Sequence, residues 1–450
     1  MDRRHVTPPS TAYLEHLKAQ VDASIAEVSP QVSQFQGAPA VDRDRLTETV
    51  ESLREELVAI AHALHADPET AYEEVRSAAL LAQALRKHGY DVTTGAHGVE
   101  TALRAEVATD GFDPATHRTV AVLSEYDALP QIGHGCGHNV IAATGIGAFL
   151  ALGSLIQQET DSGVQGRVVF LGTPAEEGHT GKEVMAAGGA FVGLDCALMV
   201  HPFGYDSASH LFLGRRLLSV TFSGHSAHAS AQPFQGRNAL DAASLAYQAL
   251  GLLRQQMPPS DRVHAIITDG GHRASVIPDR AQLDVYVRSA YPDTLKDLSR
   301  RVAQIMEGAA LMTDTGVELG WDAYPPSLPV RNNQALAGRW TQSQAARGRT
   351  ALPAGVVPEV LAGSTDFGNV SVRMPGIHPM IAISDSDVAL HTTEFAAAAA
   401  TERADTAAID GAIGLAVTAW DYLADDDLAR AVRAEFDEAG GPVDVEHYFD

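Results

Sequence analysis

The 450-residue chain carries 57 acidic and 32 basic side chains, and its formal net charge is −25 at pH 7. This charge argues against nucleic acid or an anionic membrane as a partner, and no uncharged apolar run approaches the ~20 residues of a membrane span. With two cysteines and no apolar signal segment near the N-terminus, the chain is expected in a reducing compartment, the cytoplasm.

In chain order, residues 1–40 are expected to form an extension with partial helix, because they include adjacent prolines and several serines. Helical periodicity follows over residues 46–88 and is broken at Pro68. A short apolar run at 120–124 predicts a buried strand. The Ala- and Gly-rich segment 139–155 predicts a helix narrow enough to pack closely against a sheet.

Apolar strands are also predicted over 196–203 and 378–384. Between them, residues 214–324 follow a β-α-β-β-α-β pattern, which favours an inserted α+β domain of ferredoxin-like topology. Residues 41–213 and 325–450 are then expected to form one catalytic domain around a central, mostly parallel sheet. The predicted fold class is therefore α/β.

The segment EYDALPQIGHGCGHN, residues 125–139, combines several groups that bind metals. Directly after the strand at 120–124, it joins two acidic side chains to Cys136 and His138 through a glycine-rich turn. Because Cys136 and His138 are two residues apart, the turn can direct both at one ion, and thiolate and imidazole suit zinc and its neighbours. The same two residues could instead be a buried thiol and a hydrogen-bonded histidine.

Three later segments repeat this design of a strand followed by polar side chains. An apolar run from Arg167 leads to Glu176 and Glu177, and His201 and His391 follow two further strands. Side chains at the carboxyl ends of parallel strands meet at one rim of the sheet. Because side chains alternate along an extended chain, one glutamate is expected to bind metal while the other faces a water. An ion beside a carboxylate base favours metal-assisted hydrolysis.

Taken together, these motifs resemble those of the dinuclear metal aminoacylase and carboxypeptidase family, the amidohydrolase branch of metallopeptidase clan MH. The resemblance runs from about residue 46 to about residue 423 and implies a zinc-peptidase-like catalytic domain. It also implies two divalent ions, with zinc favoured and manganese or cobalt as alternatives. In the family pattern Glu176 is the general base. The implied metal ligands are Cys136, which bridges the ions, His138, Glu177, His201 and His391.

The middle of the chain carries further motifs of the same family. SGHSAHAS resembles the G-x-x-AHA signature and implies that His228 reaches the substrate carbonyl, in many members from the partner subunit of a homodimer. Motif matches point to Asn238 and Arg288 for the polar end of the substrate. The planar fork of an arginine such as Arg288 binds carboxylates bidentately. Ser275 stands where the family carries Asn, and its hydroxyl reaches less far.

Two acidic residues, Glu125 and Asp366, leave two interpretations open, whereas Asp127 keeps the acid of the family pattern. Glu125 replaces the first acid of the D-M-D-A-L-P motif and could bind metal or make a structural hydrogen bond. Asp127 is expected to orient a metal-binding histidine rather than to bind the ion itself. Asp366 could stabilise its loop or line the site. EYDALP followed by GHxCGHN resembles a narrower group with animal β-alanyl dipeptidases and bacterial p-aminobenzoyl-glutamate hydrolases.

The sequence thus predicts a metal-dependent hydrolase that cleaves the amide bond of a small N-acyl amino acid or dipeptide. Glu176 takes the proton of the attacking water, while His228 and a metal ion stabilise the oxyanion. The alternative is a non-catalytic protein that binds small amides on the same fold. Glu176 beside intact metal ligands argues against it, because a pure binder needs no general base. The expected partners are a small amide substrate and a second copy of the chain.

Overall fold

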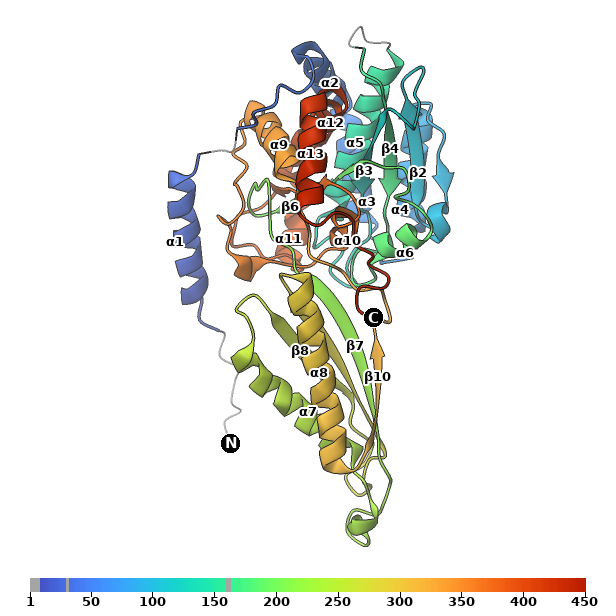
Figure 1. The fold of residues 1–450 in the computed structure, drawn as a ribbon, viewed down its shortest axis with the longest axis vertical. Helices are drawn as coiled ribbons and strands as arrows, with labels where there is room; N and C mark the ends of the chain where they lie inside the picture. Colours follow the sequence, from blue (N-terminus) through green and yellow to red (C-terminus); the bar gives the residue numbers. More distant parts are fainter. Residues whose placement is uncertain (1–8, 30–31, 159–162) are drawn as a thin grey trace.

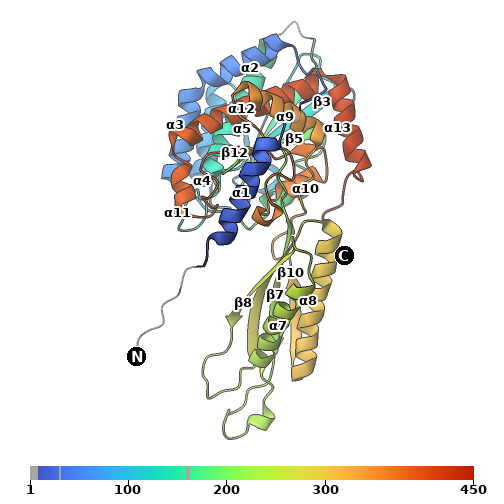
Figure 2. The same cartoon turned by 90° about the vertical axis from the view of Figure 1, so that its left-hand side faces the viewer.

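The computed structural model describes residues 9–29, 32–158 and 163–450. It has a broad α/β part and an elongated part that points away from it in both views (Figures 1 and 2). A six-stranded sheet of order β1-β2-β4-β3-β5-β11 lies at the centre of the broad part. Its strands are β1 (Thr93–Thr94), β2 (Leu103–Ala108), β3 (Arg118–Ser124), β4 (Gly166–Gly172), β5 (Cys196–Leu198) and β11 (Gly376–Ile377).

The central strands of this sheet are parallel. β3 pairs in parallel with β4 on one side and with β5 on the other, whereas β2 pairs with β4 antiparallel. Val120, Val122 and Val168 are fully buried, as expected for parallel strands that are covered on both faces. The register opposes Ser124 to Gly172, so β3 and β4 end at the same edge of the sheet. The predicted α/β class with a mostly parallel sheet is confirmed.

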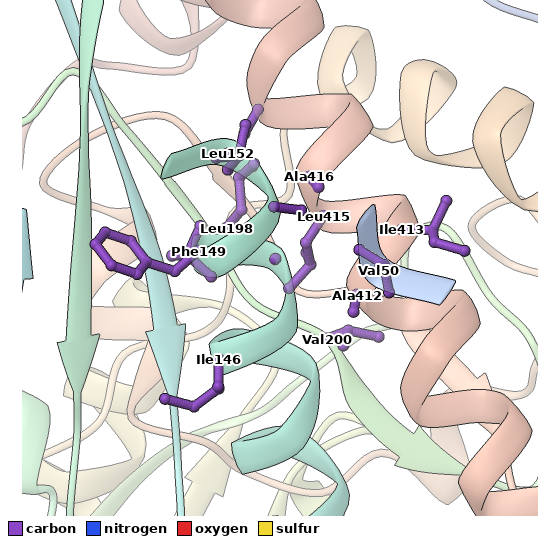
Figure 3. Packing of buried hydrophobic residues seen from close by; sticks show 14 of the residues in the cluster. Val50, Ile146, Phe149, Leu152, Leu198, Val200, Ala412, Ile413, Leu415 and Ala416 are labelled. Atoms are coloured by element: carbon purple, nitrogen blue, oxygen red, sulfur yellow. The ribbon is translucent and has the colours of Figure 1, made fainter. Parts of the chain in front are cut away.

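Helix α5 (His138–Gln157) packs against β3 and against α12 (Glu402–Ala424). Figure 3 shows Ile146, Phe149 and Leu152 of α5 beside apolar side chains of α12 and the sheet. α5 is long and apolar enough to cross a membrane, but 89% of its most apolar window is buried, as in a core helix. The other helices of this part are α2 (Ala40–Ser52), α3 (Arg54–Ala66), α4 (Val75–Lys87), α6 (Gly181–Ala187), α9 (Gln334–Ala346), α10 (Phe367–Ser371), α11 (Thr393–Ala398) and α13 (Asp426–Glu438).

The elongated part is a four-stranded antiparallel sheet of order β10-β7-β9-β8 with two helices (Figure 1). Its elements follow the predicted β-α-β-β-α-β pattern, and β8 lies at the sheet edge. Alternate side chains of β7 and β9 are buried against the helices, which is the period of a half-buried strand. The elements are β7 (Gly214–Ser223), α7 (Ala239–Leu253), β8 (Arg262–Asp269), β9 (Arg280–Ser289), α8 (Pro292–Thr313) and β10 (Gly316–Trp321).

Two of the predicted strands are broken in the structure. The segment 196–203 forms β5 and a separate β6 (His201–Phe203), and 378–384 contributes only β12 (Met380–Ala382), which pairs with β6 in parallel. Pro379 precedes β12 and has no N–H for the ladder, although its carbonyl still accepts from the His201 N–H. His201 is therefore the first residue of a separate strand, β6.

The N-terminal segment contains α1 (Ala12–Glu27), so the predicted partial helix is confirmed for the described residues. The predicted helical stretch over 46–88 is interrupted between Ala66 and Val75, around Pro68. Short 3-10 turns complete the described elements: η1 (Ala96–Gly98), η2 (Pro233–Gln235), η3 (Arg254–Gln256) and η4 (Glu359–Leu361).

Candidate metal centre

The five predicted metal ligands lie together at the carboxyl ends of β3 and β4. Cys136 lies in the turn before α5 and His138 is its first residue, while Glu177 comes from the loop after β4, His201 from β6, and His391 from the loop before α11. The Cys136 Sγ lies 3.5 Å from Nε2 of His201 and 3.5 Å from Nε2 of His391. Four separate segments of the chain therefore deliver thiol, imidazole and carboxylate groups to one place.

The donor atoms form two groups that share Cys136. Donor atoms of Cys136, His138 and His201 lie within 4.8 Å of one another, and so do those of Cys136, Glu177 and His391. A donor residue common to two groups is compatible with two neighbouring cations. The mixture of sulfur, nitrogen and oxygen suits zinc and related divalent metals.

Buried polar atoms without partners support this assignment. Within the described ranges, His138 Nε2, Glu177 Oε1 and Glu125 Oε2 are buried and have no hydrogen-bond partner. Such atoms are uncommon in folded proteins and call for an explanation, such as an ion. Burial and the neighbouring His138 lower the pKa of His201 to about 4, so His201 is neutral near pH 7, the form that binds metals. The residues therefore fit a pair of divalent cations.

The loop after β4 is not extended, and the alternation predicted for Glu176 and Glu177 does not apply. Ala175 has φ 60°, a left-handed conformation that turns the chain, and both glutamates line the same cavity. Carboxylate oxygens of both lie within 4.8 Å of a His138 nitrogen. Burial, followed by the charges of Glu125 and Glu177, raises the pKa of Glu176 well above its ordinary value. A raised pKa is typical of a carboxylate that serves as a general base.

Asp127 makes the contacts predicted for it. Its Oδ1 lies 2.9 Å from His138 Nδ1, which leaves Nε2 of that ring free to face the donor cluster. Its Oδ2 accepts a hydrogen bond of 2.8 Å from the backbone N–H of Glu177. One carboxylate therefore orients a predicted ligand from each of two loops, as the partners of metal-binding histidines normally do.

Lys182 was not identified from the sequence, yet it joins the two acids whose roles stayed open. Its fully buried ammonium donates to Glu125 Oε1 and, over 2.6 Å, to Asp366 Oδ1. The other oxygen of Glu125 lies 3.4 Å from His138 Nε2, so Glu125 makes a structural ion pair and also faces the donor cluster. Asp366 both holds Lys182 and lines the cavity. No sequence motif marks Lys182, because its role depends on segments far apart in the chain.

The donor cluster opens into a cavity of about 490 Å³, a size typical of small-molecule sites. Arg288, predicted to bind the substrate, lies in its wall. Other lining residues were not predicted from the sequence, among them His210, Phe212, Arg215 and Tyr286. These four come from strands of the elongated part and from the segment leading into it, where alternating polar residues give no distinctive signal.

His228, Asn238 and Ser275 do not reach this cavity within one chain. They lie beyond the far end of β7, where His228 bridges to Val276 and the Ala229 N–H donates to the Ser275 carbonyl. β7 has ten residues, which span about 30 Å at ~3.3 Å per residue. Asn238 instead caps α7, since its Oδ1 accepts from the Leu240 N–H over 3.0 Å.

Comparisons with known proteins agree with this geometry. Residues 214–313 match the M20 peptidase dimerisation domain. The chain is 36% identical over 396 residues to the Xaa-Arg dipeptidase of Mus musculus, covering 87% of this chain and 91% of that protein. It is 33% identical over 313 residues to one p-aminobenzoyl-glutamate hydrolase polypeptide of Escherichia coli K12, covering 64% of this chain and 63% of that one.

A solved structure from Bacillus subtilis, described as a dinuclear metal-binding peptidase of the M20 family, shares the fold. Its TM-score is 0.57 at 18% identity, and the match covers 80% of this chain and 98% of that one. The chain belongs to the M20 peptidase family.

Proposed function

We propose that the protein is a metal-dependent hydrolase that cleaves the amide bond of a small dipeptide or N-acyl amino acid. The observation that carries this proposal is the pair of donor groups that share Cys136 beside the carboxylate of Glu176. The curated relatives are a dipeptidase and an amide hydrolase, and both names describe this class of bond. A non-catalytic binding protein finds no support among these relatives.

In the proposed mechanism, two divalent cations would supply Lewis acidity toward the amide carbonyl and the attacking water. Cys136, His138, Glu177, His201 and His391 would hold them. Glu176 takes the proton of the water and later passes it to the leaving amine. Asp127 keeps the His138 ring and the Glu177 backbone in place, and Arg288 binds the carboxylate of the substrate. The metal is proposed to be zinc, with manganese or cobalt as alternatives.

We further propose that the protein works as a homodimer in which His228 acts on the partner's cavity. The match to a dimerisation domain supports this arrangement. β8 is an edge strand, and its side chains Ile266 and Ile267 are 62% and 39% exposed. An exposed apolar edge strand is a surface on which another chain can pair. A second copy would also explain why His228, Asn238 and Ser275 lie so far from their own cavity.

Metal removal tests the proposed function. Protein treated with a chelator and then freed of it should lose hydrolysis of dipeptides and N-acyl amino acids, and Zn²⁺, Mn²⁺ or Co²⁺ should restore it. Cys136→Ala should lower the metal content measured by elemental analysis, since it removes the thiolate shared by both donor groups. Full activity in metal-free protein would contradict the proposal.

A further inference from the structure

Two arginines face each other across strands β7 and β9 at the wall of the cavity. Arg215 is the direct cross-strand neighbour of Arg288, and both side chains line the cavity that contains Cys136 and Glu177. The ring of Tyr286 lies beside both, with its centre 5.9 Å from the guanidinium carbon of Arg215 and 5.6 Å from that of Arg288. The two guanidinium groups therefore form one cationic patch, here called the arginine pair.

No carboxylate of the described residues forms an ion pair with either member of the arginine pair. In the described part of the structure neither arginine has a carboxylate within 4.0 Å, and the buried Arg288 Nε has no hydrogen-bond partner. Arg215 donates to the Thr180 hydroxyl over 2.8 Å, which leaves its charge uncompensated.

The carboxylates around the arginine pair and in its cavity have other partners or roles, since Glu176 and Glu177 belong to the donor cluster. Asp322, whose charge interacts with that of Arg215, accepts both of its side-chain hydrogen bonds from Arg216. Asp366 is bound by Lys182. Burial, and then the charge of Arg215, lower the pKa of Arg288. Like charges opposite each other in a sheet are destabilising, and a buried cation without a partner is costly. An anionic ligand would remove both penalties.

We infer that the arginine pair selects substrates whose released amino acid is acidic, either glutamate or aspartate. Arg288 binds the main-chain carboxylate, and Arg215 binds the side-chain carboxylate. This inference rests on the proposed function. It adds to that function the chemical class of the amino acid that hydrolysis releases. A substrate with one carboxylate neutralises one guanidinium and leaves the other uncompensated, whereas an acidic amino acid supplies two. Each planar guanidinium can hold a carboxylate through two parallel hydrogen bonds.

A matched series of N-benzoyl amides tests this selection, because the cavity wall includes Phe203 and Phe212. With metal-loaded protein, kcat/KM for N-benzoyl-glutamate should exceed that for N-benzoyl-glutamine by roughly 30-fold or more, the size of a lost buried charge pair. Arg215→Gln should abolish this ratio by slowing only the glutamate substrate. Arg215→Glu should reverse the charge preference and favour N-benzoyl-lysine.

Arg262→Gln is the matched control. Arg262 is the other cross-strand neighbour of Arg288, but it donates to the Pro259 and Asp261 carbonyls and lies outside the residues that line the cavity. Its removal should leave the glutamate-to-glutamine ratio unchanged. If Arg215→Gln slows the glutamate and glutamine substrates equally, both arginines hold one carboxylate and the inference is wrong.

A binding measurement tests the preference for acidic amino acids independently of the proposed hydrolysis. Calorimetry with metal-loaded Glu176→Gln protein should show tighter binding of N-benzoyl-glutamate than of N-benzoyl-glutamine, and Arg215→Gln should remove the difference. If the wild-type protein hydrolyses no amide but binds N-benzoyl-glutamate more tightly, the proposed hydrolysis is wrong. The inferred preference for an acidic amino acid then remains valid. Equal binding of the two ligands overturns the selection, whether or not hydrolysis is found.

Discussion

The carboxyl of Glu74 supports the turn that places Glu176 in the cavity. It is fully buried and accepts hydrogen bonds from the Ala175 N–H over 2.9 Å and from the Thr101 hydroxyl over 3.0 Å. Ala175 has a positive φ, a strained conformation for a residue with a side chain, which the surroundings must stabilise. Glu74 therefore acts on the base through backbone geometry rather than by contact with substrate.

The pKa of Glu74 predicts a dependence of stability on pH. Burial, and then the charge of Asp127, raise this pKa from 4.5 to about 7. Because the folded state holds the proton more tightly, the stabilisation is complete below pH 4.5 and is lost as the pH rises toward 7. Glu74→Gln mimics the protonated carboxyl, so its urea midpoint should fall less than that of the wild type between pH 5 and pH 8. Equal falls in the two proteins would contradict the assigned pKa.

At the scale of elements, the close contact of α5 with β3 depends on Gly145. A Cβ added there would lie 2.8 Å from the Ser124 Cβ and 3.2 Å from the Leu123 carbonyl oxygen. Gly145→Ala should therefore destabilise the protein by about 1–3 kcal/mol, the usual cost of overpacking. Gly308 in α8 has no atom within 4 Å of such a Cβ, so Gly308→Ala should stabilise it by up to ~1 kcal/mol. Urea unfolding of both variants checks the contrast, which fails if both change stability in the same direction.

The sequence could predict that the residues following the buried strands meet in one site. Buried apolar runs followed by Cys136, Glu176 and Glu177 mark a strand and its carboxyl end, and parallel strands bring those ends together. The breaks before His201 and Met380 were missed, because the apolar runs continue through Met199 and Val200 and across Pro379.

Lys182 and Arg215 could not be predicted as parts of the site. Lys182 is buried only because Glu125 and Asp366, from two other segments, surround its ammonium. Arg215 reaches the cavity because of the pairing of β7 with β9 and the placement of the elongated part against the broad part. The periodicity of one segment shows neither which distant segments surround Lys182 nor how the elongated part places Arg215 at the cavity.

At the scale of the whole molecule, the elongated part has a different role at each end. The end near the broad part supplies Arg215 and Arg288 to the cavity, whereas the far end carries His228, which is exposed to solvent. Figures 1 and 2 show the far end extending away from the broad part. A site completed by His228 therefore requires a second chain or a large closure of the first.

Mixed dimers distinguish these two arrangements. His228→Ala and Glu176→Gln should each be nearly inactive while His228→Ala keeps its metals. If His228 acts on the partner's cavity, mixing the variants under conditions of subunit exchange should restore part of the activity, because one of the two sites in a heterodimer then has both residues. Heterodimers proven by mass spectrometry that remain inactive would show that His228 acts within its own chain.

The central claim is that Glu176 is the base and Glu177 is a metal ligand, and one paired measurement tests it most directly. Metal content and kcat are determined together for Glu176→Gln and Glu177→Gln. Glu176→Gln should keep its metals and lose kcat by about 10²-fold or more, since the amide cannot accept a proton. Glu177→Gln should instead lose metal. Full metal loss in Glu176→Gln with normal metal content in Glu177→Gln would contradict this assignment.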